Sequence, residues 1–141
     1  MMLPEAPDLG VLLVRTDYSD NEAWGAALSA ATAVYEEDDY DRIGALVQPV
    51  ESSALANLGP EDLLSLPRAS YVSLIAVADS QTMRDQTVLF LNLNELDEPV
   101  GRTFRSIPTE VEPIVANLTI ANMDFATFAD HADPDGIFRG F

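Results

Sequence analysis

The stretch that decides the fold is "GVLLVRTDYSDNEAWGAALSAATAVY", residues 10–35. Its first part, 10–18, is an unbroken apolar run that ends in polar residues, which is typical of a strand buried on both faces of a sheet. Its second part, 19–35, has apolar residues at the spacing of one buried helix face, and Ser19 with Glu22 fits a capping box at its start. A buried strand followed directly by such a helix predicts an α/β domain.

The rest of the chain continues this alternation and then changes to a hairpin. Further strands are expected at residues 42–50, 70–80, 86–95 and 102–108, and further helices at 59–67, after Pro108 and at 123–131. Pro49 cannot donate a hydrogen bond to a neighbouring strand, so it is expected at the end of its strand or on an edge of the sheet. The turn-rich residues 96–101 predict that the last two strands are antiparallel.

The predicted order is therefore β-α-β-α-β-β-β-α-α, and no boundary or repeat divides the chain. We expect a single α/β domain over residues 1–141 with a mixed sheet of about five strands. Residues 1–9, which hold two prolines, are expected to form an irregular lead-in, and residues 133–141 a C-terminal turn and anchor.

Composition limits the function. The chain has 141 residues, 48% of them hydrophobic, and no cysteine, which excludes disulfides, thiolate catalysis and sulfur-ligated zinc. No apolar run is long enough to span a bilayer, and the first residues carry no positive charge, so a cytoplasmic protein is expected. The absence of lysine also excludes Schiff-base and pyridoxal chemistry.

The charge is strongly negative: 24 acidic residues stand against 7 arginines, giving a net charge of −17. Binding to nucleic acid or to an anionic membrane is not expected, because both need cationic side chains. Three explanations remain: solubility, an acidic face that binds a basic protein such as a nuclease, and cation binding. The acids are spread along the whole chain, which favours solubility without excluding the basic partner.

The stretch "VRTDYSD", residues 14–20, is the best candidate for a ligand site. It follows the first strand, and open α/β sheets bind ligands at the carboxyl ends of their strands. Asp79 ends the third strand and would be a neighbour if the two strands pair, so Arg15, Asp17 and Asp79 are the candidate ligand-binding residues. The structural alternative is that Asp17 and Asp20 stabilise the turn and the helix start.

A second candidate is a run of acids flanked by tyrosines, which could bind a basic partner because tyrosine is common in interfaces. The alternative is a solvated turn. The candidate partner-binding residues are Tyr35, Glu36, Glu37, Asp38, Asp39 and Tyr40.

The ending "HADPDGIFRGF", residues 131–141, has the spaced acids of a calcium-binding loop. An EF-hand alignment that places Gly136 at position 6 lacks the first ligand, and position 12 falls beyond residue 141. Asp133 to Gly136 fits a type I turn instead, after which Ile137, Phe138 and Phe141 can pack on the domain. His131 is the single histidine and no nucleophile motif accompanies it, so no catalytic residue, metal or cofactor is expected.

The stretches "VRTDYSD" and "LTIANMDFATFADHADPDGIFRGF" (118–141), together with Trp24, resemble a family of small actinobacterial proteins with an uncharacterised domain. The resemblance runs from about residue 10 to the end and is most specific in the C-terminal block. It implies a bacterial cytoplasmic domain, and it carries no activity or site residues.

The sequence thus favours a non-enzymatic, acidic protein-interaction module whose partner is a basic protein, such as a toxin bound by an immunity protein. One alternative is a small-ligand binder or enzyme that uses the carboxylates at the strand ends. Another is a homodimer that uses the exposed face of the strand at 102–108.

Overall fold

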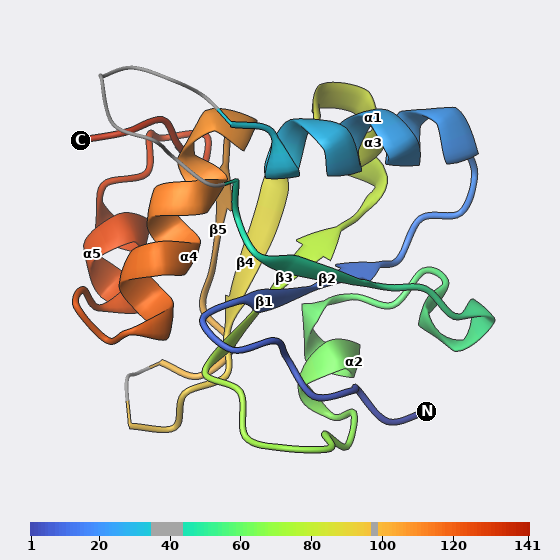
Figure 1. Cartoon of the computed structure of the whole chain (residues 1–141), viewed down its shortest axis with the longest axis horizontal. Helices are drawn as coiled ribbons and strands as arrows, with labels where there is room; N and C mark the ends of the chain where they lie inside the picture. Colours follow the sequence, from blue (N-terminus) through green and yellow to red (C-terminus); the bar gives the residue numbers. More distant parts are fainter. Residues whose placement is uncertain (35–43, 97–98) are drawn as a thin grey trace.

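The structure is a computed structural model that describes residues 1–34, 44–96 and 99–141. Within these residues the chain forms a single α/β domain with a mixed six-stranded sheet and five α-helices (Figure 1). The strands are β1 (Val11–Arg15), β2 (Val47–Val50), β3 (Leu74–Ala78), β4 (Val88–Asn92), β5 (Thr103–Ser106) and β6 (Ile137–Phe138). The helices are α1 (Asn21–Thr32), α2 (Pro60–Leu64), α3 (Ser80–Asp85), α4 (Val111–Thr119) and α5 (Phe125–Asp130), with 3-10 turns at Ser53–Leu55 and Pro108–Glu110.

The strand order across the sheet is β2-β1-β3-β4-β5-β6. β1 pairs in parallel with β2 and β3, β4 is antiparallel to β3 and β5, and β6 is parallel to β5. The chain therefore leaves β1 on one side to form β2 and returns on the other side to form β3. This change of direction creates a topological switch point between β1 and β3. The position of β2 at the edge confirms the placement predicted from Pro49.

The sheet buries a core on each face. β1, β3 and β4 are buried along their whole length, which explains their continuous apolar sequences. α1, α3, α4 and α5 cover one face, whereas α2 and the N-terminal segment cover the other (Figure 1). Alternate residues of each strand enter opposite cores: Leu13 and Ala76 face the first, and Leu12 and Ile75 face the second.

Phe104 on β5 is the centre of an aromatic cluster in the larger core. Its ring centroid lies 5.3 Å from that of Phe90 on β4, 4.9 Å from Phe125 and 6.2 Å from Phe128 on α5. Phe138 on β6 is fully buried and completes the cluster at 6.4 Å. Phe125 and Phe128 are both buried, and the cluster attaches the C-terminal segment to the sheet.

The predicted element order is wrong in two places, since α3 and β6 were not expected. Residues 80–85 are too short and too polar to show helical periodicity, and α3 is instead defined by its cap, Asp79, whose side chain accepts a hydrogen bond from the Thr82 amide. β6 has only two residues, and pairing with β5 makes the expected anchor a strand.

Helix starts also differ from expectation. Asp20, not Ser19, caps α1 by accepting a hydrogen bond from the Ala23 amide at 3.0 Å. α4 begins at Val111 after a 3-10 turn, so Pro113 lies in the first helical turn, where its missing N–H interrupts no helical bond.

The expected lead-in at 1–9 is packed: Leu3 is fully buried, and its amide donates to the Pro67 carbonyl at 2.8 Å.

The C-terminal turn forms as predicted, because the Gly136 amide donates to the Asp133 carbonyl at 2.8 Å. Arg139 then pairs with both carboxylates of the suspected calcium loop, at 2.6 Å from Asp133 and 2.7 Å from Asp135. The hydrogen bonds from Arg139 and from the Ile137 amide lower the pKa of Asp135. The loop acids are thus neutralised by an arginine of the chain itself.

The anchor is only partly as expected. Ile137 and Phe138 are buried, whereas Phe141 contacts Phe128 and His131 but stays 71% exposed. Among the described residues, no helix has the length and apolar character needed to cross a membrane.

Candidate functional site

The carboxyl ends of β1 and β3 meet at the switch point, as the sequence predicted. Asp17 follows β1, Asp79 follows β3, and both line one small hollow of about 200 Å³. Thr16, Asn57, Leu58 and Ser80 complete its wall. The structure therefore brings Asp17 and Asp79 together.

Asp79 is occupied by partners from its own chain. Its carboxylate accepts two hydrogen bonds from Arg105 on β5, one of them at 3.0 Å from Nη1 to Oδ1, and two more from the amide and hydroxyl of Thr82, each at 3.1 Å. Partial burial alone would raise the pKa of Asp79, but the hydrogen bonds and charge of Arg105 and the Thr82 bonds outweigh it, so the pKa is lowered. Asp79 is an ionised helix cap within an ion pair.

Asp17 has the turn role that was its structural alternative. Its Oδ1 accepts hydrogen bonds from the Ser19 amide at 2.8 Å and from the Ser19 hydroxyl at 2.6 Å. These two bonds lower the pKa of Asp17. The side chain thus shapes the connection between β1 and α1.

Arg15 does not line the hollow. Its side chain is buried, and its three nitrogen groups donate to the Asp17 carbonyl at 2.7 Å, to Glu51 at 2.9 Å and to the Asn21 side chain at 2.9 Å. The guanidinium also lies 4.5 Å from the ring centroid of Tyr18 and 5.3 Å from that of Trp24. Arg15 thus links the end of β1 to the start of α1; it contacts the backbone of Asp17 but does not line the hollow that Asp17 and Asp79 share.

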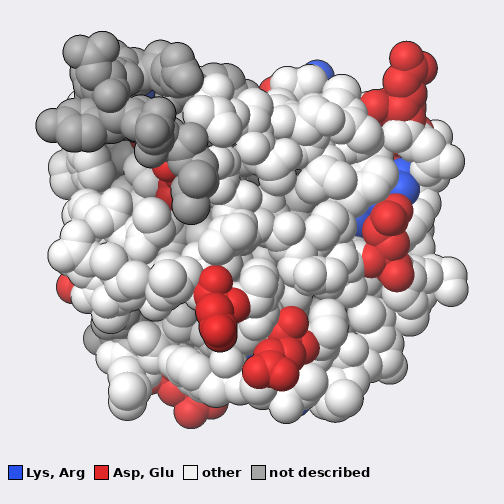
Figure 2. All heavy atoms as spheres, in the orientation of Figure 1, with Lys and Arg blue, Asp and Glu red and all other residues white. Residues whose placement is uncertain are grey.

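Two further kinds of site were considered from the sequence, a metal site and an acidic site for a basic partner. Among the described residues, no three His, Asp or Glu side chains lie together in a way that could hold a metal ion. The candidate residues Tyr35, Glu36, Glu37, Asp38, Asp39 and Tyr40 lie within 35–43, outside the described residues. On the face shown in Figure 2, acidic side chains form separate groups on a largely uncharged surface, not one continuous patch.

The homodimer prediction places its contact on residues 102–108. β5 lies between β4 and β6, and β6 pairs with Arg105 and Ser106, so half of that edge of β5 is already occupied. The predicted contact uses the face of β5, where Thr103 is exposed and Arg105 is engaged by Asp79.

A different surface lies at the opposite end of the sheet, where the segments leading into β1, β2 and β3 meet the end of α4. Three hollows of about 250, 300 and 250 Å³ follow one another there. The first and second share Tyr71, Ser73, Leu74 and Thr119, and the second and third share Leu9 and Thr119. The three hollows thus form one continuous depression, which we call the basal groove.

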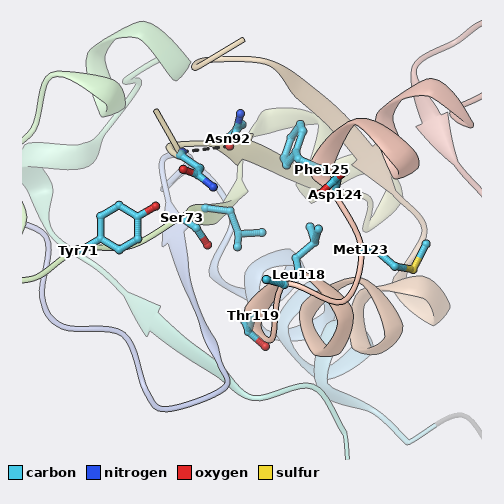
Figure 3. A pocket seen from close by; sticks show the side chains of 11 residues that line it. Tyr71, Ser73, Asn92, Leu118, Thr119, Met123, Asp124 and Phe125 are labelled. Atoms are coloured by element: carbon cyan, nitrogen blue, oxygen red, sulfur yellow. Dashed lines mark hydrogen bonds between the residues drawn. The ribbon is translucent and has the colours of Figure 1, made fainter. Parts of the chain in front are cut away.

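The first hollow of the basal groove is drawn in Figure 3. Tyr71 lies on one side of it, and Leu118 and Phe125 lie on the other. Asn92 lies at the end of β4 and is buried, with its side chain donating to the Pro99 carbonyl at 3.2 Å. The hollow therefore has an aromatic side, an aliphatic side and polar groups at its margin.

Large apolar side chains of the basal groove are exposed to solvent. The exposed fractions are 70% for Tyr71, 62% for Leu9, 59% for Ile120 and 46% for Leu46. An exposed leucine alone is ordinary, but contiguous apolar surface on a monomer marks an interaction site. These four residues come from four separate segments and line connected hollows.

Among the described residues that line the basal groove, every charged side chain is negative. Glu5 and Asp8 line its middle hollow, Glu112 the third and Asp124 the first. None of these four carboxylates pairs with an arginine of the described residues, and no described arginine lines the groove. The groove is thus apolar and anionic.

The backbone that builds the basal groove is held in demanding conformations. Leu9 has φ 58° and Ala121 has φ 55°, both in the left-handed region that side chains disfavour. Gly10 is needed for close approach, because a Cβ there would lie 2.6 Å from Pro7 Cγ and 2.7 Å from the Leu46 carbonyl oxygen. Strain of this kind concentrates at functional surfaces.

No residue spacing in the sequence predicts the basal groove, because its lining comes from segments far apart in the chain. The one local signal was a large apolar residue at a turn, such as Leu9 before Gly10 or Ile120 at the end of α4.

The comparisons with known proteins agree with the expected resemblance in one respect, namely that the chain carries an uncharacterised domain from residue 10 to residue 141. No curated protein and no solved structure matches the chain. A family model does match, over residues 10–141, which is all of the chain except the packed N-terminal segment. The chain therefore belongs to the family described as "Domain of unknown function (DUF6924)".

Proposed function

We propose that this chain is a non-enzymatic protein-binding domain, and that the basal groove is its binding surface for a basic protein partner. One observation carries the proposal: the groove combines four exposed large apolar side chains with four carboxylates that have no arginine partner among the described residues.

Each half of that combination favours association with a protein. Burying exposed apolar area stabilises a complex by roughly 25 cal/mol per Å², before the costs of association are counted. Removing water from the carboxylates costs free energy unless cationic groups take the place of that water, so the carboxylates select a basic partner. The net charge of −17 would speed the approach of such a partner. A basic toxin, bound as immunity proteins bind theirs, is one partner with this chemistry.

The switch point supports the alternative, a small-ligand site or an enzyme, much less well. A ligand there would have to displace Arg105 from Asp79 or Ser19 from Asp17. The first exchange would cost the ion pair between β5 and Asp79, and the second would cost the hydrogen bonds that shape the turn after β1.

The experiment compares two substitutions that introduce the same charge at an exposed apolar residue. Ile120→Asp lies in the basal groove, whereas Leu96→Asp lies outside it at a residue that is 93% exposed. Each variant and the wild type are immobilised and exposed at low salt to lysate of the source cells, and the retained proteins are quantified by mass spectrometry. Thermal melting checks that both variants are folded.

We expect the wild type and Leu96→Asp to retain a basic protein, and Ile120→Asp to retain at least tenfold less of it. Retention should also weaken as salt is raised. Equal retention by both variants, or retention of no basic protein by the wild type, would overturn the proposal.

A further inference from the structure

We infer that the occupant of the basal groove is an extended segment of the partner in which an apolar side chain is followed by basic ones. The inference rests on the proposed function and adds the form and chemistry of the partner. It commits to a polypeptide segment, and not to a small molecule or to a second copy of this chain.

The size of the hollows favours an extended segment. Pockets for small molecules have volumes of roughly 300–1,000 Å³. The three hollows, at about 250, 300 and 250 Å³, each lie at or below the lower end of that range. A row of small connected hollows suits successive side chains of one extended chain better than it suits one compact ligand.

The third hollow selects an apolar side chain. Its wall is formed by Leu46 from the segment before β2 and by Val115, Ala116 and Ile120 from α4. Of the described residues that line it, only Glu112 and Thr119 have polar side chains, and Glu112 is half-buried. A leucine or an aromatic residue of the partner would fill this space and cover Leu46 and Ile120.

The other two hollows select cations. Glu5 and Asp8 place two carboxylates in the middle hollow. In the first hollow Asp124 lies beside Phe125, and Tyr71 lies across the hollow from them (Figure 3). Arginine suits this combination, because its guanidinium can pair with a carboxylate and stack on an aromatic face at the same time. The expected order along the groove is therefore apolar, basic, basic.

A second copy of this chain does not have the required chemistry. It carries the same net charge of −17, so its approach to an anionic groove is repulsive. Strand addition at the nearby edge is also disfavoured, because Pro49 on β2 has no N–H to donate to an added strand. Recognition therefore depends on side chains that enter the hollows.

The experiment uses a synthetic nine-residue peptide of three Leu-Arg-Arg repeats as the probe. The peptide is titrated into the ¹⁵N-labelled chain at 50 mM salt, and chemical shifts are followed by NMR. Two control peptides replace every arginine with glutamate or every leucine with serine. We expect shifts concentrated at residues 5–10, 44–46, 70–74 and 116–124, and weaker or no binding by both controls.

Matched charge variants test the selection of cations. Glu5→Gln with Asp8→Asn removes two charges inside the groove, and Glu22→Gln with Glu61→Gln removes two charges outside it. The first pair should weaken peptide binding about tenfold, and the second pair less than twofold. Equal weakening by both pairs, or shifts spread over α1 and α2, would show non-specific attraction and overturn the inference.

The two proposals fail differently. If the peptide does not bind but Ile120→Asp still abolishes capture of a basic protein, the groove is a protein-binding surface and the extended-segment inference is wrong. If neither peptide nor protein responds to groove substitutions, the proposed function is wrong as well.

Discussion

The two ends of the central sheet treat their charged residues in opposite ways. At the carboxyl ends of β1 and β3, Asp17, Asp79 and Arg15 each find partners in the chain. At the other end, Glu5 and Asp8 have no arginine partner in the part of the chain that the structure describes, and they lie beside exposed apolar side chains. The switch point attracts attention in the sequence because its residues look reactive, yet their bonds hold elements together. The segments at the other end carry no motif in the sequence, yet their apolar side chains are exposed to solvent and their carboxylates face solvent beside them.

The largest expected effect concerns the ion pair at the switch point. Arg105→Gln leaves the mostly buried Asp79 carboxylate without its charge partner and should lower the free energy of unfolding by about 2 kcal/mol. Arg102→Gln, which breaks the more exposed pair with Asp130, is the matched control and should cost about 0.5 kcal/mol or less. Urea denaturation measures both. Similar losses in the two variants would mean that Asp79 does not need Arg105, and the switch point would again be a candidate for ligand binding.

The same pair predicts a pH dependence. The pKa of Asp79 is lowered in the folded chain from its ordinary value of 3.8, so the stabilisation is fully present above that value. It is lost as the pH falls through the lowered folded pKa, where the carboxylate is protonated. The stability difference between wild type and Arg105→Gln should therefore be constant from pH 7 to 5 and narrow below about pH 3.8. Urea denaturation across this pH range measures the difference. A stability difference that grew on acidification would contradict the conclusion that Arg105 stabilises the ionised Asp79.

A smaller effect should appear at the basal groove. Leu9 has φ 58°, a conformation that glycine adopts more easily than alanine, so Leu9→Gly should be more stable than Leu9→Ala by about 1 kcal/mol. At Leu46, which is not among the residues with positive φ, glycine should be less stable than alanine by about 0.5–1 kcal/mol. Thermal and urea denaturation of the four variants gives both differences. The same sign at both positions would remove the argument for strain in the groove.

The smallest expected effect is none. Calcium at millimolar concentration should leave the melting temperature unchanged, because Arg139 already pairs with Asp133 and Asp135. Differential scanning calorimetry with calcium and with chelator tests this. An upward shift with calcium would mean that the C-terminal turn is a metal site after all.

The parts of this fold that could be predicted are those whose signal is local. The continuous apolar runs of β1, β3 and β4, the stripe of α4 and the Asp133–Gly136 turn each follow from residues close together in the chain. α3 and β6 were not predicted, because α3 is defined by its capping side chain and β6 by its pairing with β5. Their signals depend on contacts and not on composition.

The candidate site was predicted in part for the same reason. Strand ends can be located from the sequence, so the meeting of Asp17 and Asp79 was expected. Arg105, the partner of Asp79, lies 26 positions further along the chain and reaches it only because of the strand order. The basal groove depends on five segments that meet at one end of the sheet, and no local pattern marks such a meeting.

The central pairing of the sheet has a consequence for how the chain reaches its fold. β1 and β3 pair at Leu13 and Ala76, which are 63 positions apart, whereas the hairpin of β4 and β5 pairs Leu91 with Thr103. Contacts between distant positions form slowly, so we expect the hairpin to form early and the centre of the sheet late. In that interval the apolar edges of β1 and β3 are open to other chains. A net charge of −17 keeps unfinished chains apart, so the acidity protects the folding protein as well as the folded one.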